Sequence, residues 1–186
     1  MRTCLSRRGL LAAFAASSAL FLCGAVVGYS SITTEWARAS LGSVEDVPLF
    51  GSSFAAIFVQ NISVVLFLFS GVLTLGLTSL VSLTMMSIYV GATMSVATTN
   101  GGVAAVLSDT GSYIGLEFLG MVLAATAGLC PVFALLGRAL RAETDPSLTS
   151  VGAYAAAVRT SMATLSISAL LILLAAGIEA AVIASR

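Results

Sequence analysis

Apolar stretches long enough to cross a lipid bilayer recur along this chain from Leu10 to its end. The hydrocarbon core of a bilayer is about 30 Å thick, so a crossing helix needs about 20 mainly apolar residues. Hydrophobic residues make up 59% of the 186 residues, only 9% are charged, and the mean hydropathy is +1.08. Soluble domains carry roughly 25% charged residues. The sequence therefore predicts an integral protein of the cell membrane, with the lipid bilayer as its first partner.

The apolar stretches predict an all-α fold, a single integral membrane domain (1–186) with about five transmembrane helices. The predicted spans are 10–29, 54–77, 80–97, 111–137 and 162–183. Little more than Thr78 and Ser79 separates the second span from the third, so these two are expected to be antiparallel neighbours. A short helix is expected from Val103 to Leu107, and Pro131 is expected to kink the fourth span.

Arginine residues predict how the chain is oriented in the membrane. They flank the start of the first span and the connector between the fourth and fifth spans (Arg2, Arg7, Arg8, Arg138, Arg141 and Arg159). Basic residues close to the ends of spans favour the cytoplasm. We therefore expect a cytoplasmic N-terminus, a cytoplasmic connector at 138–160, an outside loop at 30–51 that holds Trp36, and an outside C-terminus.

The first span could also be read as a secretory signal. Ser6-Arg7-Arg8 loosely resembles a twin-arginine signal, and Cys23 a lipoprotein cleavage site. However, Leu22 is too bulky for the small residue that such cleavage prefers, and the apolar run exceeds the 7–15 residues of a signal core. We expect an uncleaved helix.

Several chemistries lack their usual residues. The chain contains no histidine, which is the commonest general base and metal ligand. Its three cysteines show no C-x-x-C spacing, and its net charge is zero with no basic stripe to follow phosphates. We therefore expect no enzymatic activity, no cofactor, no metal site and no nucleic-acid partner.

Glu117 is the most unusual residue, because it lies within the predicted fourth span. A charged side chain at the centre of a membrane helix costs about 2.5–3.5 kcal/mol on insertion scales. Gln60 and Asn61 could donate amide N–H groups to it, and Tyr113, four residues earlier, lies on the same helix face. With Glu179 of the last span, these residues form a predicted polar cluster inside the membrane. It could fix helix register or belong to a proton or ion path.

Small residues recur at four-residue spacing, which lets membrane helices approach closely. They are Ser87, Gly91 and Ser95 on the third span, and Gly111 and Gly115 on the fourth. We expect them to pack helices within the chain rather than to form a homo-oligomer face, although both remain open.

The order of several motifs resembles the stage II sporulation protein M family. These motifs are Phe58-Val59-Gln60-Asn61, Gly71, Gly76, Gly91, Glu117 and Gly177-Ile178-Glu179-Ala180-Ala181-Val182. The family's strongest signature is Pro-His-Gly followed two residues later by Glu. Aligned on Glu117, those three positions are Ser112, Tyr113 and Ile114, so the histidine is absent. The resemblance carries over only Glu117, Asn61 and Glu179 as matching polar positions.

The resemblance implies a prokaryotic multi-pass membrane protein that works with others. Similar proteins accompany ABC transporters or serve export and immunity for circular bacteriocins, and the namesake belongs to a septal machinery. We therefore expect a non-enzymatic scaffold or accessory subunit, with an ABC transporter subunit as a candidate partner. The alternative is a small-solute or ion transporter or channel that uses Glu117.

Overall fold

The computed structural model describes residues 7–31, 54–141 and 149–185. They form α1 (Arg7–Ser31), α3 (Phe54–Phe69), the 3-10 helix η2 (Ser70–Val72), α4 (Leu77–Gly101), α5 (Val103–Thr110), α6 (Ile114–Arg141) and α7 (Ser150–Ala184). Five helical segments in this part of the chain are long and apolar enough to cross a membrane. The all-α membrane bundle of about five spans is confirmed, and the chain is a membrane-embedded protein. Most of the predicted loop 30–51, including Trp36, lies outside the described residues.

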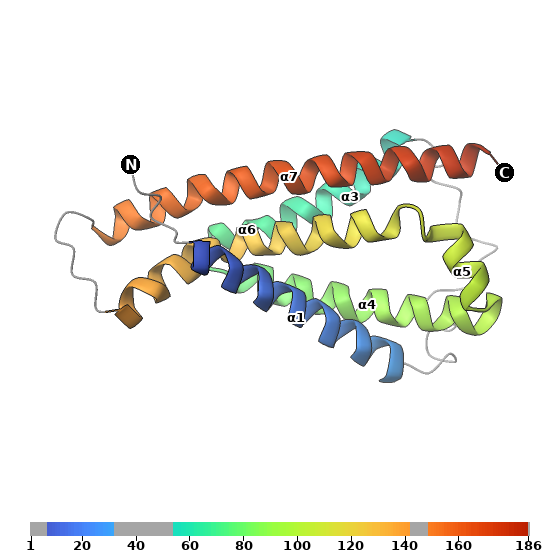
Figure 1. The fold of residues 1–186 in the computed structure, drawn as a ribbon, viewed down its shortest axis with the longest axis horizontal. Coiled ribbons are helices and arrows are strands. Elements are labelled where there is room, and N and C mark those ends of the chain that lie inside the picture. Colours follow the sequence, from blue (N-terminus) through green and yellow to red (C-terminus); the bar gives the residue numbers. More distant parts are fainter. Residues whose placement is uncertain (1–6, 32–53, 142–148, 186) are drawn as a thin grey trace.

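Helix α6 lies at the centre of the bundle and contacts α1, α3, α4 and α7 (Figure 1). Its most apolar stretch is 67% buried within the chain, whereas the corresponding stretch of each other span is 22% buried. The spans run in alternating directions, so the start of α1 and the end of α7 lie at opposite ends of the bundle (Figure 1). Four helices therefore surround one, and their outer faces are free for lipid.

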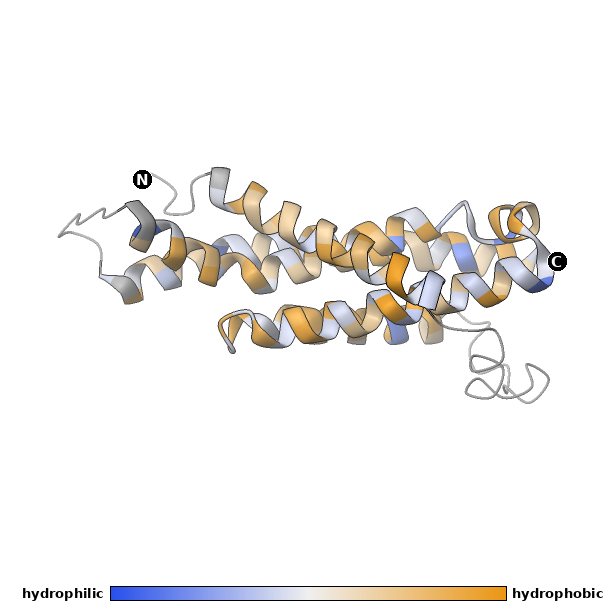
Figure 2. Ribbon diagram, turned by 90° about the horizontal axis from the view of Figure 1, so that it is seen from below, coloured by the Kyte–Doolittle hydropathy of each residue, from blue (hydrophilic) through white to orange (hydrophobic). Residues whose placement is uncertain are grey.

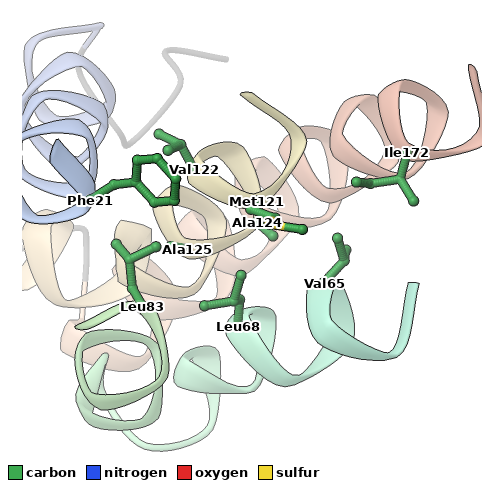
Figure 3. Close-up of a cluster of buried hydrophobic side chains, with 9 residues drawn as sticks. All are labelled: Phe21, Val65, Leu68, Leu83, Met121, Val122, Ala124, Ala125 and Ile172. Atoms are coloured by element: carbon green, nitrogen blue, oxygen red, sulfur yellow. The ribbon is translucent and has the colours of Figure 1, made fainter. Parts of the chain in front are cut away.

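The main core lies where these helices meet α6. Its buried members are Phe21, Val65, Leu68, Leu83, Met121, Val122, Ala124, Ala125 and Ile172 (Figure 3). The rings of Phe21 and Phe118 pack at 5.2 Å between centroids with a tilt of 53°. Because lipid tails are as apolar as these side chains, close packing rather than hydrophobic burial holds such helices together.

The helix limits differ most from the predicted spans at α7. This helix begins at Ser150, twelve residues before the predicted span (162–183), and α6 continues to Arg141. The predicted connector 138–160 is therefore mostly helical. The reason is local: Thr149 accepts a hydrogen bond from the Gly152 amide at 3.1 Å and caps a helix that opens with an alanine-rich stretch. Residues 142–148 of the connector lie outside the described residues.

Smaller differences occur at the other spans. Helix α3 ends at Phe69 and is followed by η2, so the second span stops at Val72 rather than at residue 77. The third span runs from Leu77 to Gly101, longer than the predicted 80–97. The fourth begins at Ile114 rather than at Gly111, because α5 and a turn occupy the preceding residues.

Helices α6 and α7 extend past the other spans at one end of the bundle. The start of α1 is level with Ala134, because Leu10 packs against Cys130, Ala134 and Ala157. The turn between η2 and α4 ends at a similar level, where Gly76 meets Leu129 of α6. Residues 135–141 and 150–156 are called the α6–α7 extension; its tip passes the other spans (Figures 1 and 2), while the Tyr154 hydroxyl reaches back to the Val72 carbonyl.

Two further features follow the length of the bundle. Hydrophobic residues run along all the helices, and the most hydrophilic ones gather in the half nearest the C-terminus and at the opposite tip (Figure 2). Pro131 lies inside α6, and the last turns of this helix bend away from the line of its first part (Figure 1). Proline removes a backbone hydrogen bond and bends helices in this way.

Candidate polar site within the membrane

A carboxylate and an amide meet between two spans. Asn61 of α3 donates a hydrogen bond from Nδ2 to Oε1 of Glu117 on α6, at 2.5 Å. Both side chains are half-buried. Glu179 of α7 is near enough for its carboxyl group to interact electrostatically with that of Glu117. The site therefore joins α3 and α6 by a hydrogen bond, with a second carboxyl group from α7 within electrostatic range.

The start of α6 explains where Glu117 lies. It is in the first turn of the helix, where backbone N–H groups lack helical partners and the helix dipole favours a carboxylate. The Glu117 amide donates to the Tyr113 carbonyl at 3.2 Å, and so does the Leu116 amide, at 3.0 Å. Tyr113 thus supports the site through its backbone, just before the helix begins.

Gln60 differs from the other predicted members of the cluster. Its side chain is exposed, whereas that of Asn61 is half-buried. Consecutive helix residues point about 100° apart, so only one of the two can face α6. The structure brings Asn61, Glu117 and Glu179 together and leaves Gln60 on the outer face of α3.

Glu117 lies nearer the end of the bundle that carries α5 than the end with the α6–α7 extension. It precedes Leu129 by twelve residues, which is about 18 Å along a helix, and Leu129 meets Gly76 at the end of the α3–α4 turn. The carboxylate therefore lies in the half of the bundle that contains α5. The end of the bundle with the α6–α7 extension is the more distant one.

Two hydroxyl groups deeper in the bundle, on α6 and α7, are paired with backbone carbonyls, whereas the buried Ser17 hydroxyl of α1 has no partner among the described residues. Thr126 donates to the Val122 carbonyl at 2.7 Å, and Ser168 of α7 donates to the Gly120 carbonyl of α6 at 2.6 Å. Between Glu117 and Arg138, helix α6 carries no charged residue. Among the described residues, no group of three or more Asp, Glu, His or Cys could hold a metal ion. The arrangement can fix the register of α3, α6 and α7. The Glu117 carboxyl group can bind or release a proton, but α6 offers no further charged group between it and Arg138.

The small residues of the third span contact α1. A Cβ on Gly91 would lie 2.0 Å from the Ala25 carbonyl oxygen, and Ser87 fills the space beside Gly24. A Cβ on Gly28 would lie 2.0 Å from the Ile88 carbonyl oxygen. Gly24 and Gly28 form a G-x-x-x-G pair, a known signal for close packing in membranes, which the sequence reasoning missed. This face of α4 is occupied within the chain.

The other predicted packing residues lie elsewhere. Gly115 has open space around it, and Gly111 lies in the turn between α5 and α6, near the Leu107 carbonyl. The predicted stripe on the fourth span is therefore not a packing face. Gly111 precedes α6, which begins at Ile114, and Gly115 has no neighbouring helix close to it. Ser95 is half-buried on α4, and its carbonyl accepts a hydrogen bond from the Thr99 hydroxyl at 2.7 Å.

Residues 17–182 match the profile of the family described as Stage II sporulation protein M. The match includes part of the first span, the next three spans and nearly all of the last, and it contains Asn61, Glu117 and Glu179. The chain belongs to this family. Comparison with curated proteins and with solved structures found no match. In this member of the Stage II sporulation protein M family, the backbone carbonyl of Tyr113 accepts a hydrogen bond from the Glu117 amide.

Proposed function

We propose that this protein is a non-enzymatic scaffold or accessory subunit of a membrane machinery, of the kind that serves ABC-type export or bacteriocin maturation and immunity. The observation that carries the proposal is the close packing around α6. Ala124, Ala125 and Ala127 are fully buried at its centre, and the buried hydroxyls near them are bonded to backbone carbonyls. A bundle packed in this way is suited to be a rigid binding partner for another protein.

The α6–α7 extension supports the same proposal. It continues past the other spans, and Arg138 lies within it while Arg159 lies at its base. Positive charge near span ends favours the cytoplasm. We therefore place the extension and the start of α1 in the cytoplasm and the end of α7 outside. A protein partner, such as a subunit of an ABC transporter, would meet the extension there.

A transporter or channel is the second candidate, and the polar site favours it. Two carboxyl groups lie together within spans, where isolated charges are costly and often mark ion or proton paths. Replacing Glu117 by Gln would separate the candidates in a flux assay with reconstituted protein. Unchanged flux would remove the carboxylate from any path, and abolished flux in a folded variant would favour transport.

Site-specific cross-linking in cells tests the scaffold proposal. A photoreactive residue is placed at Val151 or Ala155, which are exposed on the extension, and a matched one at Ile167, which is exposed on the middle of α7. We expect a discrete protein adduct, identified by mass spectrometry, at the first two positions and none at Ile167. Two results together would contradict the proposal. These are the absence of an adduct at all three positions in cells and solute transport in liposomes by the purified monomer alone.

A further inference from the structure

The turn between α3 and α4 presents leucine side chains at its tip. Leu73 is 84% exposed, Leu75 54% and Leu77 63%. An aqueous turn would be expected to carry polar or charged residues at such positions. The leucines therefore mark this turn as one that avoids water or is covered by a partner.

The polar groups of the turn are bonded to one another. The Ser70 hydroxyl donates to Oγ1 of Thr78 at 3.0 Å, and Oγ1 of Thr74 accepts from the Thr78 amide at 3.1 Å. The Gly76 amide donates to the Gly71 carbonyl at 2.7 Å. Irregular backbone inside a bilayer needs partners within the protein for its polar groups, and these bonds supply partners for several groups of the turn.

Neighbouring helices complete this pairing. Ser79 of α4 donates to the Leu68 carbonyl at 2.5 Å, and the hydroxyl of Tyr154 on α7 donates to the Val72 carbonyl. These two carbonyls lie near the end of α3, where helical partners are missing. These two bonds tie the end of α3 and η2 to α4 and α7.

The charge pattern and the level of the turn agree with this. Between Asp46 and Asp109 the sequence contains no charged residue, so this hairpin has no arginine to hold its tip at the surface. Gly76, at the end of the turn, lies beside Leu129 and Val132 of α6, and α6 continues beyond these residues to Arg138 and Arg141.

We propose that the α3–α4 turn is immersed in the membrane and that its leucines insert among the acyl chains of the leaflet on the side of the α6–α7 extension. At this end of the molecule, the extension alone passes from these spans into water. The three leucines form a lipid-binding surface that holds the hairpin at a fixed depth. A covering protein is the rival occupant, and it is excluded when the purified protein is tested alone in lipid.

Cysteine labelling in liposomes tests the immersion. A variant with its native cysteines replaced by serine receives Leu73→Cys or Leu75→Cys, with Val151→Cys as the water-facing control and Leu170→Cys as the lipid-facing control. A charged maleimide is supplied on both sides of the membrane, and labelling in SDS measures total thiol. Because lipid excludes charged reagents, we expect Leu73→Cys to react at least about tenfold more slowly than Val151→Cys, as Leu170→Cys does. Equal rates for Leu73→Cys and Val151→Cys would overturn the proposal.

Fluorescence quenching gives a readout that does not depend on thiol reactivity. Trp36 is replaced by Phe, and a single Trp is placed at Leu73 or at Val151. Lipids brominated on their acyl chains should quench the Leu73→Trp emission and leave that of Val151→Trp nearly unchanged. Quenching that is equal at the two positions would contradict the immersion of the turn.

Discussion

The amide of Asn61 and the carboxyl group of Glu117 stabilise each other in a place where each would be costly alone. Their hydrogen bond of 2.5 Å joins α3 to α6, and hydrogen bonds between membrane helices contribute about 0.6 kcal/mol on average and up to about 1.7. Glu179 adds a second carboxyl group whose charge would repel the first. The site therefore balances one favourable bond against one unfavourable pair.

Changing either partner of this bond should lower stability in a predictable order. Glu117→Gln keeps an oxygen acceptor and should change the free energy of unfolding by less than about 0.5 kcal/mol. Asn61→Asp replaces the donor with a third carboxyl group and should cost about 2 kcal/mol or more. Unfolding in mixed micelles measures both. A larger loss for Glu117→Gln than for Asn61→Asp would contradict the observed pairing.

Leu75 has a backbone φ of +51°, which L-residues other than Gly, Asn and Asp rarely adopt. Leu75→Gly should therefore stabilise the protein relative to Leu73→Gly, by about 1 kcal/mol. Leu73 is the matched control because its side chain is also exposed while its φ is −79°. Both variants lose a leucine from the turn, so the difference between their unfolding free energies isolates the backbone term. No difference would show that Leu75 is not strained.

Residue types predicted part of the polar site. Glu117 stood out because it is ionisable within an apolar span, and Asn61 because its amide can pair with it. Which of Gln60 and Asn61 faces α6 depends on helix rotation, which two adjacent polar residues do not specify. The bond of Tyr154 to the Val72 carbonyl joins residues far apart in the chain, and no local pattern predicts it.

At the scale of the helices, α1 and α4 come into close contact at two glycines, each of which faces a backbone carbonyl of the other helix. Gly28 faces the Ile88 carbonyl and Gly91 faces the Ala25 carbonyl. A carbonyl cannot swing aside as a side chain can, so the two helices themselves would have to separate to admit a methyl group. This contact therefore depends on glycine at both positions.

Gly91→Ala should destabilise the bundle by about 2 kcal/mol, because it overpacks this contact. Gly115→Ala is the matched control, since its added Cβ would have no atom within 4 Å. That control should be neutral or stabilising, by up to about 1 kcal/mol, because alanine favours helix over glycine. Midpoints of SDS-induced unfolding compare the two variants. Equal midpoints would contradict the close approach of α1 and α4.

Helix lengths were harder to predict than helix positions. Apolar runs located all five spans, because the bilayer imposes a minimum length on each. The runs do not show where a helix continues into water, so the twelve additional residues of α7 were missed. Arg159 suggested a loop boundary there, but the alanine-rich stretch before it forms a helix that begins at the Thr149 cap.

At the scale of the whole molecule, five alternating spans predict that the start of α1 and the end of α7 lie on opposite sides of the membrane. The arginine distribution predicts that α1 starts in the cytoplasm. A Ser185→Cys variant should then react with an impermeant maleimide in intact cells, and a Val151→Cys variant only after the membrane is opened. The reverse pattern would invert the orientation, and labelling of both in intact cells would contradict five spans.

The most direct test of the whole account is a cysteine scan along α7, which is 35 residues and about 52 Å long. Reaction rates with a charged maleimide are measured in liposomes open to both sides. The account predicts fast reaction at Val151 and Ala155, strong protection at Ile167, Leu170 and Leu174, and fast reaction again at Ser185. Uniform reaction along the helix, or protection that begins at Val151, would contradict a membrane bundle from which α6 and α7 extend into water.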